Sequence, residues 1–444
     1  MDERTQARLS GNPRRFILFT VCYNSRAYYP VLAVLFTDLG LTLERFVLLN
    51  LVWAAAIFLF EVPSGALADT LGRKRLLVFS SLLMVAEMLC LLFAPRDGGM
   101  LLFGLCLANR VLSGTSEAAA SGADEALAYD SLPAENRAEA WDRVLAAAMR
   151  WRSAGIIVAM IAGGLLYDPS FLNRLLPEAL QIPTAVAHRL PVLLVLIQAL
   201  VCVAITLRMV EPPHPHGETG TTLKRAFHVT LDAARWVFTT PRPLVIVTGG
   251  VLIDAVVRNM TTIQSEYFRL IHIPEWSFGI IGALTGALTL LVPGIARRVN
   301  RHLDTPGSLA LVAAFAILML AGLAPAWSGL GGLIPAMLLI PCISYLGFTV
   351  SRSLHAVADS SRRATVLSVK GLVFNLGYGA CSLAFSTALS HARITHPEQP
   401  LPFLLTWQVP MLIIAALLFF PWAFRTWNRQ ECRNPDVPKG VPQP

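Results

Sequence analysis

Two long apolar stretches, Leu48 to Leu67 and Leu76 to Phe93, flank one short charged turn near the start of the chain. Each stretch can form a helix that crosses the hydrocarbon core of a bilayer, which takes about twenty apolar residues. The turn carries one acid, Asp69, and three consecutive bases from Arg73. A basic turn between two spans marks the cytoplasmic side of a membrane. The sequence therefore predicts a pair of transmembrane helices joined by a cytoplasmic turn.

The composition extends this prediction to the whole chain. Of the 444 residues, 55% are hydrophobic and only 14% are charged, whereas soluble domains are about 25% charged. A net charge of +8 would suggest nucleic-acid binding in a soluble protein, but here the bases fall in short loops, where membrane orientation explains them. We therefore predict an all-α, polytopic membrane protein without a nucleic-acid partner. Seven scattered cysteines without a C-x-x-C pair indicate neither a disulfide framework nor a metal centre.

We predict about twelve spans of the length that a bilayer requires. A break rich in proline and histidine follows Glu211 and divides the spans into two sets of six. The expected organisation is an N-terminal bundle over 1–209, a linker over 210–242 with an amphipathic segment, a C-terminal bundle over 243–426 and a tail over 427–444. The approximate spans are 15–39, 43–68, 76–94, 100–129, 138–167, 188–209, 243–270, 277–299, 307–324, 330–358, 363–391 and 403–424.

The distribution of basic residues predicts the orientation. With both termini in the cytoplasm, internal segments hold roughly 23 of the 36 Lys and Arg residues and external loops roughly 5, as the positive-inside rule requires. The expected location is the plasma membrane, or inner membrane of a bacterium, with both termini cytoplasmic.

The charged turn is the core of a longer motif, G-x-x-x-D-x-x-G-R-K-R. This motif resembles the signature loop between the second and third helices of the major facilitator superfamily. The resemblance implies two pseudo-symmetric six-helix bundles that work by alternating access around a site near the midplane. We expect Gly65 to permit close helix approach, Gly72 to form a tight turn, and Asp69 to cap a helix start or pair with a base. The motif residues, which we expect to act in gating, are Gly65, Asp69, Gly72, Arg73, Lys74 and Arg75.

The fourth predicted span resembles the family in two places. Arg110 and Gly114 match an R-x-x-x-G motif whose arginine is usually linked to proton coupling or substrate; the alternative is an arginine paired with an acid for packing. Glu117 lies two turns along on much the same face. The segment 121–132 resembles the S-G-x-x-E-A-L-x-Y-D-S-L end of this helix in bacterial exporter-like members. We expect Glu125 to lie deep in the span and Asp130, near its end, to pair with Arg73 as an inner gate.

Other polar residues inside predicted spans are candidates for coupling or binding. Glu61 precedes Pro63 in a segment that resembles the lead-in to the signature, and it serves either the helix kink or proton transfer. Arg26 and Tyr28 are expected in the central cavity, where the cation attracts an anionic substrate or favours the charged form of a carboxylate. In the seventh span, residues 254 and 258 have the spacing of a same-face ion pair, which either binds substrate or neutralises itself. This pair is Asp254 and Arg258.

These features predict a transporter that is not an enzyme. The main hypothesis is proton-coupled efflux of small amphiphilic compounds, with Glu61, Glu117 and Glu125 as candidate proton carriers tuned by Arg110 and Arg26. The alternative is uptake of an organic anion by symport or facilitated diffusion. Four arginines inside predicted spans favour it: Arg26, Arg110, Arg152 and Arg258. Efflux is weakened because Ala159-Met160 stands where antiporters of the family have Gly-Pro in the fifth span. A third possibility is a receptor that only retains the fold.

The sequence has no P-loop or other nucleotide fingerprint, so we expect no bound cofactor and a proton gradient as the energy source. The expected partners are a small-molecule substrate, protons and the lipid bilayer, and the chain is expected to act as a monomer.

Overall fold

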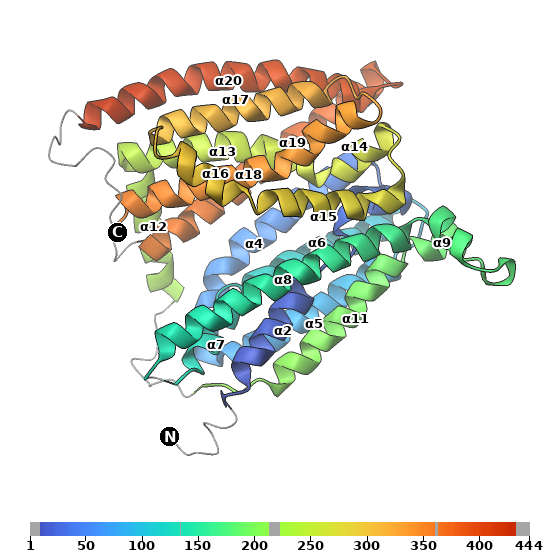
Figure 1. The fold of residues 1–444 in the computed structure, drawn as a ribbon, viewed down its shortest axis with the longest axis horizontal. Helices are drawn as coiled ribbons and strands as arrows, with labels where there is room; N and C mark the ends of the chain where they lie inside the picture. Colours follow the sequence, from blue (N-terminus) through green and yellow to red (C-terminus); the bar gives the residue numbers. More distant parts are fainter. Residues whose placement is uncertain (1–8, 134, 213–222, 360–362, 432–444) are drawn as a thin grey trace. The chain divides into compact units, whose positions relative to one another are not determined.

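The computed structural model describes residues 9–133, 135–212, 223–359 and 363–431. Within these ranges the chain forms helices and turns without a strand (Figure 1). The proline- and histidine-rich part of the linker, 213–222, and the tail from 432 onward lie outside the described residues. The helices of the first half are α2 (Asn12–Asn24), η1 (Tyr29–Val31), α3 (Leu32–Asp38), α4 (Leu43–Leu71), α5 (Arg73–Leu92), α6 (Met100–Ala120), α7 (Ala123–Asp130), α8 (Arg137–Tyr167), α9 (Pro169–Leu175), η2 (Glu178–Leu180), α10 (Thr184–Ala187) and α11 (Leu190–Arg208).

The second half is built in the same manner. Its helices are α12 (Leu223–Thr239), α13 (Pro241–Thr262), α14 (Gln264–Leu270), η3 (Glu275–Ser277), α15 (Phe278–Thr289), α16 (Val292–Val299), α17 (Thr305–Leu323), α18 (Leu330–Val357), α19 (Arg363–Thr395) and α20 (Pro400–Glu431).

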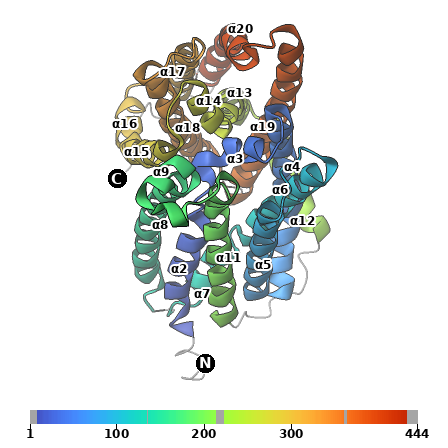
Figure 2. The same cartoon turned by 90° about the vertical axis from the view of Figure 1, so that its right-hand side faces the viewer.

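The chain forms two compact units. The first comprises Met1–Ala226 together with Ile273–Ala283, and the second comprises Phe227–His272 and Leu284–Pro444. In the first unit α5 packs between α6 and α11, while α2 packs against α8 and α11 (Figure 2). In the second unit α13 contacts α18 and α19, and α17 packs against α18 and α20. Each unit is thus a helical bundle in which helices that are distant in sequence often pack against each other.

Ten helices in the described ranges are long and apolar enough to cross a membrane by length and composition. The predicted first span is not among them, because it is broken: α2 ends at Asn24 and the helix resumes around Pro30. Proline lacks an amide hydrogen and restricts the residue before it. The fourth span is also absent from the ten, since polar residues such as Arg110 lower the hydropathy of α6. It ends at Ala120 rather than near Tyr129, because Gly122 adopts a left-handed conformation (φ +73°).

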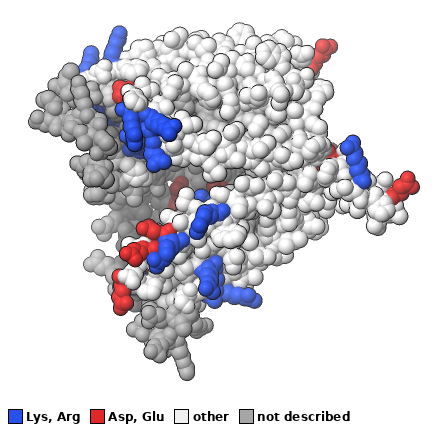
Figure 3. Space-filling view, in the orientation of Figure 1, with Lys and Arg blue, Asp and Glu red and all other residues white. Residues whose placement is uncertain are grey.

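Large apolar side chains cover much of the surface of the long helices. Leu417 and Leu418 on α20 are 68% and 74% exposed, a state that water disfavours and lipid accepts. The face in Figure 3 shows a broad uncharged surface along the middle of α17 and α20, with charged side chains toward the helix ends. This pattern suits a multi-pass membrane protein.

Small residues bring helices of the first unit close together. A Cβ atom added at Gly114 would lie 2.7 Å from the carbonyl oxygen of Trp53, so α6 packs directly on the α4 backbone. A Cβ at Gly163 would overlap the Ala27 carbonyl, which places α8 against the break after α2. Close packing of the fifth span through small residues is therefore confirmed. At Gly65 the expectation of close approach is wrong, since no described atom lies within 4 Å of an added Cβ.

Candidate functional site

A buried ion pair lies at the break between α2 and η1. The Arg26 guanidinium, 5% exposed, pairs with the Glu87 carboxylate of α5, which is 0% exposed. It also donates to the Tyr28 hydroxyl at 3.1 Å, and its Cζ lies 5.4 Å from the centre of the Tyr23 ring. A charge buried away from water is costly unless an opposite charge and hydrogen bonds compensate it. Glu87 supplies that compensation for Arg26.

A second arginine joins the same network through α6. The Nε and Nη2 atoms of Arg110 donate to the Asn109 side-chain oxygen at 2.9 and 2.7 Å. The Asn109 amide in turn donates to the backbone carbonyl of Glu87 at 2.8 Å. The Arg110 guanidinium lies 5.0 Å from the centre of the Phe36 ring. Arg110 thus contacts an amide and an aromatic ring. The alternative predicted from the sequence was an arginine that pairs with an acid for packing, and the described contacts of Arg110 include no such acid.

Three hydroxyl groups fasten the helices that carry this network. The Tyr23 hydroxyl lies 2.8 Å from Ser116 Oγ and 3.2 Å from Ser80 Oγ. Ser80 and Ser116 also bond to each other's carbonyl oxygens at 2.8 and 2.9 Å. All three side chains are buried, so α2, α5 and α6 are held in one arrangement. Glu117, exposed on α6, directly follows Ser116 and thus adjoins the network at the surface of the unit.

The candidate proton carriers occupy different environments. The prediction of one unbroken span through Glu125 is wrong, because the break at Gly122 separates α6 from α7, and Glu125 lies exposed in the first turn of α7. Its depth in the membrane stays a prediction. Glu61 is half-buried, and the hydrogen bonding near Pro63 runs through Ser64, whose hydroxyl lies 2.8 Å from the carbonyls of Glu61 and Ala118.

Sequence reasoning missed the wholly buried acid, Glu87. Its signal was present in the chain, because Glu87 is an isolated acid within an apolar stretch that we predicted to cross the membrane.

The signature loop forms a tight turn between α4 and α5. Gly72 has φ +94°, and an added Cβ would lie 3.1 Å from the Glu211 carboxyl group. Glu211 accepts hydrogen bonds from the backbone amides of Arg73 and Lys74 at 3.0 and 2.7 Å, so it caps the start of α5. We had expected an acid of the motif, Asp69, to take such a role; its side chain lies outside the described residues.

The pairing predicted between Arg73 and Asp130 is confirmed, since the two side chains form a partly exposed ion pair. Of the other bases, Lys74 is half-buried and Arg75 exposed. The gating role of the loop stays a prediction.

The second unit holds its own polar cluster on α13. The Asp254 and Arg258 side chains form the predicted same-face ion pair at 2.6 Å, and Asp254 is buried. Arg258 also donates to the Asn375 side chain at 3.0 Å and lies over the Tyr378 ring at 5.4 Å. Asp254 therefore compensates the positive charge of Arg258, while Asn375 and Tyr378 of α19 supply the other contacts of the guanidinium. Binding of substrate by this pair stays a prediction.

Comparisons with known proteins agree with the fold. A sequence profile described as the Major Facilitator Superfamily matches residues 16–380. A bacterial homologue of the human lysosomal transporter Spinster, in an inward-facing and unoccupied conformation, is 15% identical, with a TM-score of 0.65 over 97% of this chain and 99% of that one.

Two further solved structures resemble the chain over nearly its whole length. The nucleoside transporter NupG is 12% identical, with a TM-score of 0.69 over 95% of this chain and 99% of that one. A POT family transporter in complex with 5-aminolevulinic acid is also 12% identical, with a TM-score of 0.61 over 95% and 96% of the two chains. These likenesses concern the fold alone. A comparison with curated protein sequences finds no match.

Proposed function

Since this chain is a member of the major facilitator superfamily and a multi-pass membrane transporter, we propose that it is a carrier rather than an enzyme and that it exports small amphiphilic compounds in exchange for protons. Members of this fold work by alternating access. The observation that carries the proposal is the buried Arg26–Glu87 pair at the centre of the first unit's polar network. We further propose that the chain acts as a monomer in the plasma membrane with both termini cytoplasmic, without a bound cofactor.

Glu87 has the features of a proton-binding group. It is wholly buried, and its Oε2 atom has no hydrogen-bond partner among the described residues. A proton on this carboxylate would remove one charge of the pair and leave Arg26 uncompensated in a site of low dielectric constant. Arg26 is therefore stable in its present surroundings when Glu87 is charged, and less stable there when Glu87 is protonated. Such a difference between the protonation states is what allows a proton to shift an equilibrium between two conformations.

Glu117 is the candidate for exchanging protons with the substrate pathway. It is exposed on the unit's surface yet directly follows Ser116, whose hydroxyl lies 2.8 Å from that of Tyr23 beside Arg26. This acid can therefore meet water and substrate while its neighbour in the chain belongs to the network around the buried pair. The described contacts of Glu61 and Glu125 run to Ser64 and Asp124, which lie outside the network, so these two acids rank below Glu87 and Glu117 as carriers.

One observation favours a second function, transport of an organic anion. The described hydrogen bonds of Arg110 run to the neutral Asn109 side chain, so its charge is compensated less directly than that of Arg26. A cation of this kind attracts an anionic substrate group. Anion uptake would run with or without protons and in the opposite direction to efflux.

The test is proton movement in proteoliposomes that contain a pH-sensitive dye and receive lipophilic cations or organic anions. We expect substrate to trigger proton flux in the native chain, and expect Glu87→Gln and Glu117→Gln to abolish the proton flux. Glu125→Gln is the matched control, because this acid is exposed outside the network and its loss should leave coupling intact.

Substrate flux without proton movement would refute proton coupling and leave the facilitated anion carrier. In that case Arg110→Gln should abolish flux of the anion. Loss of coupling in Glu125→Gln alone would refute the assignment of Glu87 and Glu117.

A further inference from the structure

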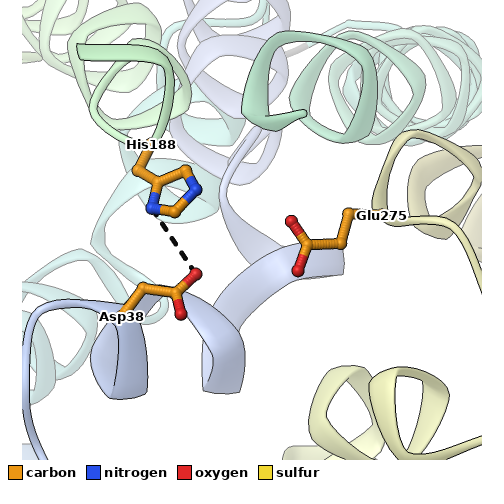
Figure 4. A group of neighbouring side chains, drawn as sticks. All are labelled: Asp38, His188 and Glu275. Atoms are coloured by element: carbon orange, nitrogen blue, oxygen red, sulfur yellow. Dashed lines mark ion pairs between the residues drawn. The ribbon is translucent and has the colours of Figure 1, made fainter. Parts of the chain in front are cut away.

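Three potential metal ligands that are not part of the polar network meet in the first unit. Asp38 ends α3, His188 follows α10, and Glu275 opens η3 (Figure 4). One ligand atom from each side chain lies within 4.8 Å of the other two. The His188 Nδ1 and Asp38 Oδ2 atoms are 3.5 Å apart. Because the three residues are widely separated along the chain, only the fold reveals the cluster.

Two of the three side chains are held in place by Tyr167. Its hydroxyl donates to Asp38 Oδ2, and its ring stacks on the His188 imidazole with centroids 4.3 Å apart and planes 7° from parallel. His188 is buried. Such contacts fix the orientation of the ligands before a metal ion arrives, as groups that hydrogen-bond the ligands do in known metal sites.

The charge of the cluster also suits a cation. Asp38 and Glu275 bring two carboxylates to the imidazole, and Arg96 is the described cation beside them. Arg96 donates to the Asp38 carbonyl oxygen at 3.1 and 3.2 Å, and its Nη2 atom lies 2.8 Å from His188 Nδ1. The guanidinium is therefore the main competitor of a metal ion for the imidazole.

The donor set identifies the class of ion. An imidazole nitrogen with two carboxylate oxygens is a set that Zn²⁺ accepts, whereas Ca²⁺ and Mg²⁺ take oxygen ligands. Metal–ligand distances of about 2.0–2.2 Å in a tetrahedral site place ligand atoms roughly 3.3–3.6 Å apart. His188 and Asp38 already have this separation. Glu275, half-buried at the start of a short helix, has to approach by about 1 Å, which its flexible side chain allows.

We propose that Asp38, His188 and Glu275 bind a divalent transition-metal ion such as Zn²⁺, with water in the fourth position. His188 binds through Nδ1, and Arg96 moves off this atom while keeping its bonds to the Asp38 carbonyl. Glu275 belongs to the segment Ile273–Ala283, which packs in the first unit although the chain on both sides belongs to the second. The bound ion ties this segment to α3, so it restrains the segment during the transport cycle.

The test is Zn²⁺ binding by the purified full-length protein in detergent, measured by competition with a chromophoric chelator. We expect one site per chain, and an affinity at least tenfold lower in Glu275→Gln and in His188→Gln. Matched controls are Glu398→Gln and His302→Gln, which change exposed residues outside the cluster. Equal binding in all four variants, or no binding by the native chain, would show that the cluster is only a hydrogen-bonded group of charges.

A gain of affinity separates the proposal from simple misfolding. Arg96→Gln removes the positively charged guanidinium that competes for His188 Nδ1, so we expect Zn²⁺ to bind several-fold more tightly; a damaged fold would bind more weakly. Zn²⁺ should also slow amide hydrogen exchange over Ile273–Ala283 in the native chain and not in Glu275→Gln. Unchanged affinity in Arg96→Gln would contradict the assignment of Nδ1 as the ligand. None of these readouts requires transport, so they stand or fall independently of the proposed function.

Discussion

Removal of one partner from the Arg26–Glu87 pair should destabilise the protein far more than removal of both. Both side chains are at most 5% exposed, so solvent does not screen the charge that is left behind. A buried charge whose partner has been removed costs about 3–5 kcal/mol, whereas replacing a whole buried pair by apolar residues is often nearly neutral. We therefore expect Glu87→Leu and Arg26→Leu each to lose about 3–5 kcal/mol of stability, and the double variant to recover most of that loss.

The assay is a double-mutant cycle on unfolding in detergent, followed by tryptophan fluorescence against denaturant. Arg75→Leu is the control, because this arginine is exposed and its loss should cost little. The expected interaction energy is several kcal/mol, well above the few tenths within which independent sites add. Single variants that lose less than about 1 kcal/mol, or a double variant whose loss is the sum of the two, would refute the argument that the pair is buried and mutually compensating.

Three further predictions concern the end of the first unit that carries the signature loop. Gly72→Ala should lower stability by about 1–3 kcal/mol, since φ is +94° and ψ is 143°; Gly65→Ala, in open space among described atoms, should be nearly neutral in the same thermal melt. Arg73→Ala should cost only about 0–1 kcal/mol because the ion pair with Asp130 is partly exposed. The charge swap of the two residues should then restore substrate flux if the pair gates transport, and a swap that fails to restore flux would argue against gating. The Asn12 side chain is buried and forms two hydrogen bonds with the backbone of Val210 in the linker, at 2.7 and 3.0 Å. In Asn12→Ala, hydrogen exchange of the Val210 amide should therefore accelerate and stability should fall by about 1–3 kcal/mol. Unchanged exchange would show that these two bonds do not hold the linker.

Local features of this protein could be predicted from the sequence. The long apolar stretches around the signature loop indicated membrane-spanning helices, because the length and hydropathy of a helix are properties of one segment. The pair of Asp254 and Arg258 was predicted for the same reason, since residues four apart share a helix face. The pairing of Arg73 with Asp130 was predicted from motifs that resemble a known family.

Contacts between distant segments were decided by the tertiary structure. Arg26 finds its partner 61 residues away in Glu87, and α8 packs directly against the helix break that positions Arg26. Glu125 is exposed because the chain turns at Gly122, although its apolar neighbours suggested a continuous span.

The meeting of Asp38, His188 and Glu275 likewise has no trace in the spacing of these residues. A sequence specifies which face of a helix is polar, but the neighbour that this face meets depends on the packing of the whole bundle. The physical reason is that a buried charge must find its compensation among whatever groups the fold brings within reach.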